Sequence, residues 1–359
     1  MHNPEGMAGT HEHGDDRKRP MARALVLAFA VASAHASSGA AEPRHDKVRG
    51  IVISTHTDGR EWGWDVIGPT IDDVREVGAG WVATHPYAPI RGDGSIPFAE
   101  FDPDEPPAYL VRPIREAHER GLKILITPHL AYWGSPFSWR GEIGFETDAQ
   151  WERFFEDYRR FIVAVARATR EADGFVVGSE LDLTLGHEDA WRRIIAEVRE
   201  ATPAALTYAA NWTDYARVPF WDALDVIGIQ AYFPISDRAS PDLPALEAGW
   251  SARMDELRRF AAGQNRKVVF TELGYNRSLT AAEEPWAYRV DGPEAEALQE
   301  SLLRVALTAV EAEPAVVGVF LWKWFPQPHS VGRNFQLATP RLKRAISDVW
   351  KHGVVPSPG

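Results

Sequence analysis

The chain has 359 residues, of which 45% are apolar and 25% charged, a composition that supplies a large buried core and excludes a disordered chain. Its 51 acidic and 39 basic side chains give a formal net charge of −12, and such a surface repels phosphate, so we expect no nucleic-acid partner. The absence of cysteine excludes disulfides, thiolate metal ligands and a cysteine nucleophile.

Residues 1–41 are predicted to be a leader that is removed or stays outside the fold. A basic cluster at residues 17–19 precedes an apolar stretch at residues 22–32, and small residues with an A-x-A pattern follow. These features are typical of a secretory signal peptide, and the apolar run is too short to span a bilayer. We therefore expect a signal peptide at about residues 17–41, a secreted or periplasmic protein, and no membrane contact once the signal is removed.

Beyond the leader, short β-branched or apolar runs alternate with segments of helical periodicity. The predicted strands are residues 50–54, 81–85, 123–128, 175–179, 206–210, 226–230, 268–271 and 318–322. The predicted helices are residues 107–120, 149–172, 188–201, 244–263, 293–312 and 340–351. The clearest helix places Trp151 and Tyr158 on one apolar stripe, and Thr147 with Gln150 predicts a capping box at its start.

The alternation of strands and helices predicts the fold class. Strands that alternate with helices pair in parallel, and nearly continuous apolar strands are buried on both faces. Eight such units predict an α/β protein with a single closed (β/α)8 TIM barrel. A doubly wound open sheet is the alternative, but no G-x-G-x-x-G motif follows the first strand.

Two glutamates end predicted strands, where a TIM barrel carries its chemistry. Glu180 ends the run Phe-Val-Val-Gly-Ser-Glu, and Glu272 ends Val-Val-Phe-Thr-Glu. A carboxylate directly after a buried strand is poorly hydrated, so it needs a partner or a function. Two carboxyl groups facing each other across a barrel mouth suit glycoside hydrolysis, one as general acid and one as nucleophile. Their separation decides between retention and inversion of configuration.

The other strand ends and the loops on the same face supply polar and aromatic side chains. At strand ends these are His56, His85, Tyr87, His129, Asn211, Trp212, Tyr232, Trp322 and Trp324. The loop tryptophans are Trp62, Trp64, Trp133, Trp139 and Trp286. Sugar rings stack on aromatic planes, so we expect substrate contacts here, Tyr87 and Trp62 among them. The tryptophans on helices, Trp151, Trp191 and Trp350, are predicted to be core.

Five segments in chain order resemble glycoside hydrolase family 113. They are Gly178–Leu181, Tyr208–Trp212, Phe220–Gly228, Ala231–Pro234 and Phe270–Tyr275, and the resemblance covers about residues 49–350. It implies a TIM barrel of the retaining glycosidase clan, a catalytic domain at residues 42–359, and endo-β-1,4-mannanase activity. By the same resemblance, Glu180 is the acid/base and Glu272 the nucleophile. The residues implied at the cleavage point are Asn211, Trp212, Tyr232 and Trp322, with His129 and Trp324 beside them.

Two residues refine this expectation. Tyr232 is expected to donate its hydroxyl to Glu272, since a hydrogen bond to a carboxylate lowers its pKa. Ser179 stands where the wider clan commonly has an asparagine that contacts the sugar 2-hydroxyl, and Asn211 is the candidate to replace that contact. This departure leaves the choice between mannose and glucose substrates open.

The predicted glycosidase needs no metal and no cofactor and acts on a polysaccharide or oligosaccharide. Two alternatives to this prediction remain. The histidines His56, His85 and His129 end the first three strands and could gather zinc in a metal-dependent hydrolase, although the chain lacks an H-E-x-x-H motif. A carbohydrate-binding barrel without catalysis is the other, since a fold does not establish a function.

Overall fold

The computed structural model describes residues 47–98, 101–102, 105–238, 241–287, 292–326 and 335–353. The predicted leader lies outside the described residues, so the signal peptide and the secreted location stay predictions. Within the described residues, no helix combines the length and the apolar character needed to cross a membrane.

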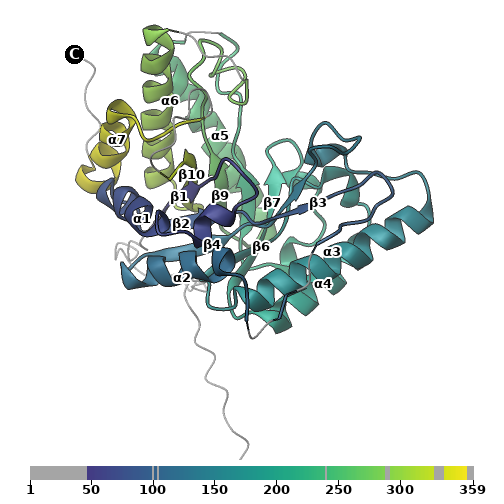
Figure 1. Ribbon diagram of the computed structural model, residues 1–359. Helices are drawn as coiled ribbons and strands as arrows, with labels where there is room; N and C mark the ends of the chain where they lie inside the picture. Colours follow the sequence, from purple (N-terminus) through teal and green to yellow (C-terminus); the bar gives the residue numbers. More distant parts are fainter. Residues whose placement is uncertain are drawn as a thin grey trace, which may run out of the picture.

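Eight parallel strands close into a barrel in the order β1-β10-β9-β8-β7-β6-β4-β2 (Figure 1). They are β1 (Val48–Ile53), β2 (Trp81–Thr84), β4 (Lys123–Ile126), β6 (Gly174–Ser179), β7 (Ala205–Asn211), β8 (Ile227–Gln230), β9 (Val268–Leu273) and β10 (Val316–Trp324). Each of the predicted strands overlaps one of them. Because β10 pairs with β1, the sheet has no open edge. The predicted closed TIM barrel is confirmed, and the open-sheet alternative is wrong.

Helices cover the outside of the barrel. They are α1 (Ile67–Glu76), α2 (Ala108–Glu119), α3 (Asp148–Ala168), α4 (Glu188–Ala201), α5 (Leu243–Gln264), α6 (Pro293–Ala312) and α7 (Pro340–Ser347), with a π-helical turn at Asp348–His352. Figure 1 shows α3 and α4 side by side on one flank, and α5 and α6 on another. The predicted capping box is present, because the Thr147 side chain accepts from the Gln150 backbone and Gln150 accepts in return.

Two connections differ from the predicted pattern. Helix α1 was not predicted, because Gly68 and Pro69 at its start look like a loop, although proline fits the first turn of a helix. Ile71 and Val74 are buried on its inner face. Between β7 and β8, residues 212–226 are all described and hold no α-helix, only the 3-10 turns η4 (Tyr215–Arg217) and η5 (Trp221–Ala223).

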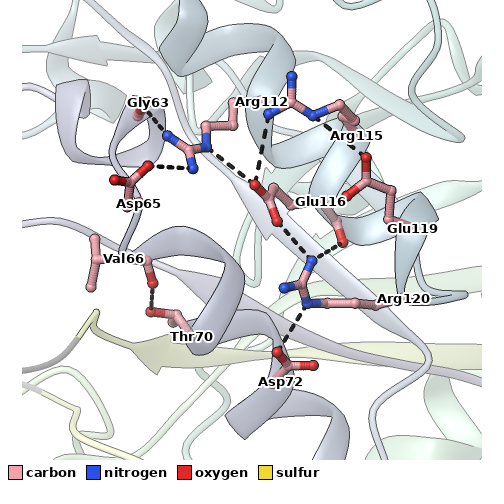
Figure 2. Close-up of polar contacts among 10 residues, drawn as sticks. All are labelled: Gly63, Asp65, Val66, Thr70, Asp72, Arg112, Arg115, Glu116, Glu119 and Arg120. Atoms are coloured by element: carbon pink, nitrogen blue, oxygen red, sulfur yellow. Dashed lines mark hydrogen bonds and ion pairs between the residues drawn. The ribbon is translucent and has the colours of Figure 1, made fainter.

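An ion-pair network fastens α2 to the α1 region (Figure 2). Glu116 of α2 is 9% exposed and receives hydrogen bonds from Arg112 at 3.2 Å and Arg120 at 2.7 Å. Arg112 also binds Asp65 before α1 at 2.7 Å, and Arg120 pairs with Asp72 of α1 at 3.1 Å. Each arginine thus bonds Glu116 within α2 and one carboxylate of the α1 region, Asp65 or Asp72, and the network helps to fix α2 against that region.

A second, two-stranded sheet lies beyond β2 and β4 and was not predicted. Strand β3 (Tyr87–Pro89) pairs in parallel with β5 (His129–Ala131), with Tyr87 opposite His129. Each of these short strands follows a barrel strand by two residues. They therefore extend the barrel at its carboxyl end and bring Tyr87 and His129 together there.

Candidate active site

Glu180 and Glu272 come from strands on the same rim of the barrel. Glu180 directly follows β6 with φ of +52°, a left-handed conformation that costs a non-glycine residue on the order of 1 kcal/mol and is found most often at functional sites. Its backbone N–H donates to the Ala209 carbonyl at 2.9 Å. Glu272 lies within β9 and is 4% exposed. The structure brings the two carboxyl groups close enough for the charge of one to act on the other.

Arg140, which sequence analysis missed, is a cation whose charge acts on both carboxyl groups. It belongs to the 3-10 turn η2 (Arg140–Glu142) after β5, and its Nη2 donates to Glu180 Oε2 at 2.5 Å. Desolvation opposes the positive charge, but the nearby Glu180 and Glu272 outweigh it, so the pKa of Arg140 is raised. Arg140 is therefore a permanent cation that pairs with Glu180 in this conformation. Nothing in its local sequence distinguishes it from a surface arginine.

The carboxyl group of Glu272 has its own set of contacts. The Tyr232 hydroxyl donates to Oε2 at 2.6 Å, which is the expected hydrogen bond. The Gln230 amide, at the end of β8, lies between this carboxyl group and the Ser179 hydroxyl. His129 Nε2 lies 3.7 Å from Oε1, which is beyond hydrogen-bond distance. Gln230 was not predicted, although a polar residue ending an apolar strand was a usable signal.

The electrostatics of the site favour the protonated form of Glu272. Burial raises the pKa of Glu272 to about 8, and the negative charge of Glu180 adds to the effect. The hydrogen bond from Tyr232 and the charges of Arg140 and Lys323 act in the opposite direction without overcoming it. Glu180, by contrast, is paired with Arg140.

Lys323 is a second cation that sequence analysis missed. Its side chain is buried in β10, with the ammonium 4.7 Å from the Trp322 ring and 5.1 Å from the Phe325 ring. Burial lowers the pKa of Lys323 to about 8, and the charge of Glu272 partly offsets this. The peptide bond between Trp322 and Lys323 is cis. The half-buried Trp322 ring also lies near the two buried histidines, with centroid distances of 5.2 Å to His85 and 6.3 Å to His129.

The three histidines considered for a metal site do not come together as a set. His85 and His129 are buried and stacked, with ring centroids 5.2 Å apart, whereas His56 is exposed. Burial lowers the pKa of His85 and of His129 well below the ordinary value, and the cations Arg140 and Lys323 lower both further. Both rings are neutral at pH 7. Among the described residues, no three His, Asp or Glu side chains are placed to hold a metal ion, so the geometry lends the metal-dependent alternative no support.

Two aromatic pairs lie on opposite sides of the barrel mouth. Tyr87 of β3 contacts Trp133 with ring centroids 5.0 Å apart. Trp212, after β7, stacks on Trp286, beyond β9, with centroids 5.8 Å apart and ring planes 18° apart. Trp133 and Trp286 are 60% and 42% exposed. Asn211, half-buried at the end of β7, directly precedes Trp212. An amide group and an aromatic ring are therefore neighbours on that side of the barrel mouth.

Trp62 and Trp324, which were expected to contact substrate, have no exposed surface in this structure. The Trp62 ring lies in the core with its edge 5.0 Å from His85, and its indole N–H donates to the Ile53 carbonyl at 2.9 Å. Trp324 packs in the core with the Lys343 ammonium 5.0 Å from its ring. Trp62 was expected in a loop and Trp324 at a strand end, and both rings lie in the core.

A closed parallel barrel with a carboxyl pair and aromatic side chains at the carboxyl ends of its strands is the architecture of barrel glycoside hydrolases. The model of Glycoside Hydrolase Family 113 matches residues 71–334. The chain belongs to this family and is a glycoside hydrolase.

Solved structures agree with the fold. A β-1,4-mannanase of family 113, solved as a complex, is 21% identical with a TM-score of 0.73, over 86% of this chain and 99% of that chain. The family 113 β-mannanase AaManA from Alicyclobacillus acidocaldarius is 24% identical with a TM-score of 0.72, over 86% of this chain and 98% of that chain. A family 5 mannosidase from Rhizomucor miehei is 13% identical with a TM-score of 0.57, over 84% of this chain and 92% of that chain. No curated relative matches the chain.

Proposed function

We propose that the protein is a retaining glycoside hydrolase that cleaves β-1,4-linked mannan-type polysaccharides or oligosaccharides, with Glu180 as acid/base and Glu272 as nucleophile. Membership of family 113 and the similarity to β-1,4-mannanases support the substrate. The single observation that carries the reaction type is the placement of two carboxyl groups, the half-buried Glu180 and the buried Glu272, on the same rim of the barrel and close enough to interact. Double displacement needs one protonated and one ionised carboxyl group at the outset.

The proposed reaction has two steps. First, the Glu272 carboxylate attacks the anomeric carbon while Glu180 gives its proton to the departing glycosidic oxygen, so that a glycosyl ester forms and the aglycone leaves as an alcohol. Then the Glu180 carboxylate takes a proton from water, whose oxygen attacks the anomeric carbon and releases Glu272. One proton circulates, and both carboxyl groups return to their starting state.

Substrate binding must rearrange the proton before the first step. In the structure Glu180 is paired with Arg140, and burial favours the protonated form of Glu272, whereas the attack requires a protonated Glu180 and an ionised Glu272. A sugar that separates Arg140 from Glu180 and desolvates the pair would allow the proton to pass to Glu180, so the resting state is one proton transfer from the reactive state.

The aromatic pairs are proposed to bind sugars on either side of the cleavage point. Trp133 with Tyr87 and Trp212 with Trp286 expose ring faces, on which the C–H faces of sugars stack. The residues proposed to contact the sugar at the cleavage point are Asn211, Trp212, Tyr232 and Trp322, with the buried His129 beneath them. Export through the leader at residues 1–41 is part of the same proposal and is supported by sequence alone.

Incubation with a panel of mannans and glucans, followed by product sizing and NMR of the first-formed anomer, tests this function. We expect cleavage of β-1,4-mannan with the β-anomer formed first. Release of the α-anomer would contradict retention, and cleavage of glucans alone would contradict the substrate. Glu180→Ala should keep activity on substrates with good leaving groups and gain rate with azide, because azide needs no base.

A further inference from the structure

Gln230 links the two strands that carry the carboxyl pair. It is the last residue of β8 and is completely buried, at 0% exposure. Its amide lies between Ser179, the last residue of β6 and 2% exposed, and the Glu272 carboxyl group on β9. A buried primary amide needs a partner for each of its polar ends, and here the partners are these two side chains.

The amide can meet its partners in two orientations. With its NH2 group toward Glu272, it donates to Oε2 at 2.7 Å and Oε1 at 3.2 Å, and its oxygen accepts from Ser179 Oγ at 2.8 Å. In the opposite orientation, Nε2 donates to Ser179 Oγ at 2.8 Å and the amide oxygen faces the Glu272 carboxyl group. The first arrangement suits an ionised Glu272, both of whose oxygens accept, and the second requires a protonated Glu272 that can donate.

Ser179 can follow either orientation, because a hydroxyl group both donates and accepts. The three side chains therefore form a chain of hydrogen bonds whose direction reverses when Glu272 gains or loses a proton. No group has to change its position by more than a rotation of the amide and of the hydroxyl. A hydrophobic residue at position 230 would remove the amide that reaches both oxygens of Glu272 and would take this partner away from Ser179.

We propose that Gln230 is a positioning residue that holds the Glu272 carboxyl group in one place in both its protonated and its ionised state, with Ser179 reversing its hydrogen bond to match. This inference rests on the proposed function to the extent that Glu272 is the nucleophile and must pass between those states during the reaction.

The other groups around Glu272 cannot take this role. They are Tyr232 of the segment after β8, Glu180 after β6, His129 of β5, Arg140 of η2 and Lys323 of β10. His129 is too distant for a hydrogen bond, and Arg140 is bonded to Glu180. Tyr232 binds one oxygen, Oε2, whereas the Gln230 amide reaches both oxygens.

The test follows the titration of Glu272 directly, by NMR of protein carrying 13C-labelled glutamate, with Glu272→Gln to assign the signal. Gln230→Leu removes both polar ends at a similar side-chain volume. Because a hydrogen bond to a charged group is about twice as strong as one to a neutral group, this change should raise the pKa of Glu272 by about half a unit to one unit. Ser179→Ala should give a smaller rise.

Gln299→Leu is the matched control, because Gln299 is also a buried amide, 5% exposed, and donates to the Tyr275 carbonyl at 2.7 Å away from the carboxyl pair. It should lower stability and leave the titration of Glu272 where it is. In kinetics on mannooligosaccharide, Gln230→Leu should reduce kcat about 10–100-fold with KM changed less than about 3-fold. Gln299→Leu should change neither constant by more than about 2-fold.

A Gln230→Leu protein whose Glu272 titrates as in the wild type, with kcat equal to that of Gln299→Leu, would overturn the inference. Failure of the wild type to hydrolyse any mannan would instead refute the proposed function, and the NMR titration would still decide the role of Gln230.

Discussion

Glu116 and Glu272 are both buried glutamates, but their surroundings have opposite character. Glu116, at the junction of α1 and α2, receives hydrogen bonds from two arginines (Figure 2). Glu272, at the barrel mouth, faces a second carboxyl group, and burial raises its pKa to about 8. The arginines around Glu116 neutralise a charge and fasten two helices, whereas the cations near Glu272 leave its proton in place. The comparison shows that burial alone does not mark a functional carboxyl group, and that the neighbours distinguish the two: a pair of arginines for Glu116 and a second carboxyl group for Glu272.

The largest expected difference between the two glutamates is in activity. Glu272→Ala should lower kcat by at least about 10⁴-fold, because no other group can form the glycosyl ester. Glu116→Gln should keep kcat within about 2-fold and destabilise the fold by about 1–2 kcal/mol, because it weakens the ion pairs that bridge α1 and α2. Kinetics on mannan and denaturant unfolding of both variants check this. An inactive Glu116→Gln protein that is folded would break the comparison.

The two carboxyl groups should also differ in how stability depends on pH. The folded chain keeps a proton on Glu272 up to about pH 8, whereas the unfolded chain releases it near the ordinary pKa of 4.5. The free energy of unfolding should therefore fall as pH rises between these values, since the folded state binds more protons. Glu272→Gln does not titrate, and it should remove a slope worth on the order of 2–4 kcal/mol.

Denaturant unfolding of the wild type and Glu272→Gln at about pH 5 and about pH 8 measures this slope. Glu116→Gln serves as the control, and its slope should remain that of the wild type. Equal slopes for the wild type and Glu272→Gln would mean that Glu272 is ionised in the folded chain at neutral pH.

Removing a cation should sharpen the comparison. The charge of Arg140 lowers the pKa of Glu272, so Arg140→Gln should raise it further. Because the active enzyme holds one proton on the coupled carboxyl pair, both limbs of the kcat/KM profile should move to higher pH, by about one unit. Arg153→Gln is a control on an exposed ion pair with Asp93 and should leave the profile unchanged. An acidic limb that moves to lower pH would contradict the electrostatic account of the site.

The smallest expected effect concerns the tryptophans. Trp133→Ala should raise KM about 5–10-fold through loss of a stacking surface, with little loss of stability because the ring is 60% exposed. The contrasting variant is Trp62→Ala, which should destabilise the fold by about 3–5 kcal/mol because its ring is completely buried. Isothermal titration with mannooligosaccharide and thermal unfolding separate the two effects. Unchanged KM in Trp133→Ala would remove it from the proposed binding surface.

The sequence was sufficient for the barrel because its strands are short apolar runs buried on both faces, and such runs are visible without tertiary information. Glu180 and Glu272 were predicted for the same reason, since a carboxylate that ends an apolar strand stands out. Arg140 and Lys323 could not be predicted in this way. Their roles depend on where a loop and a strand end come to lie, and an arginine or lysine in such a segment is usually solvated.

Which aromatic residues are buried could also not be predicted from the sequence. Trp62 and Trp133 both follow barrel strands in polar segments, yet one is 0% and the other 60% exposed. What separates them is the hydrogen bond from Trp62 to the Ile53 carbonyl, which turns its ring into the core. The 3-10 turn η1 (Arg60–Gly63) places the Trp62 indole next to the Ile53 carbonyl. Local composition does not predict this placement.

The central claim is that Glu272 attacks the anomeric carbon and forms a covalent ester. The most direct test is incubation with an activated 2-deoxy-2-fluoro-mannoside, which slows hydrolysis of the ester, followed by mass spectrometry of the intact protein and its peptides. The account predicts one added fluoromannosyl group, located on Glu272, and no label in Glu272→Gln. A label on Glu180, or rapid turnover of the wild type with no added mass, would contradict it.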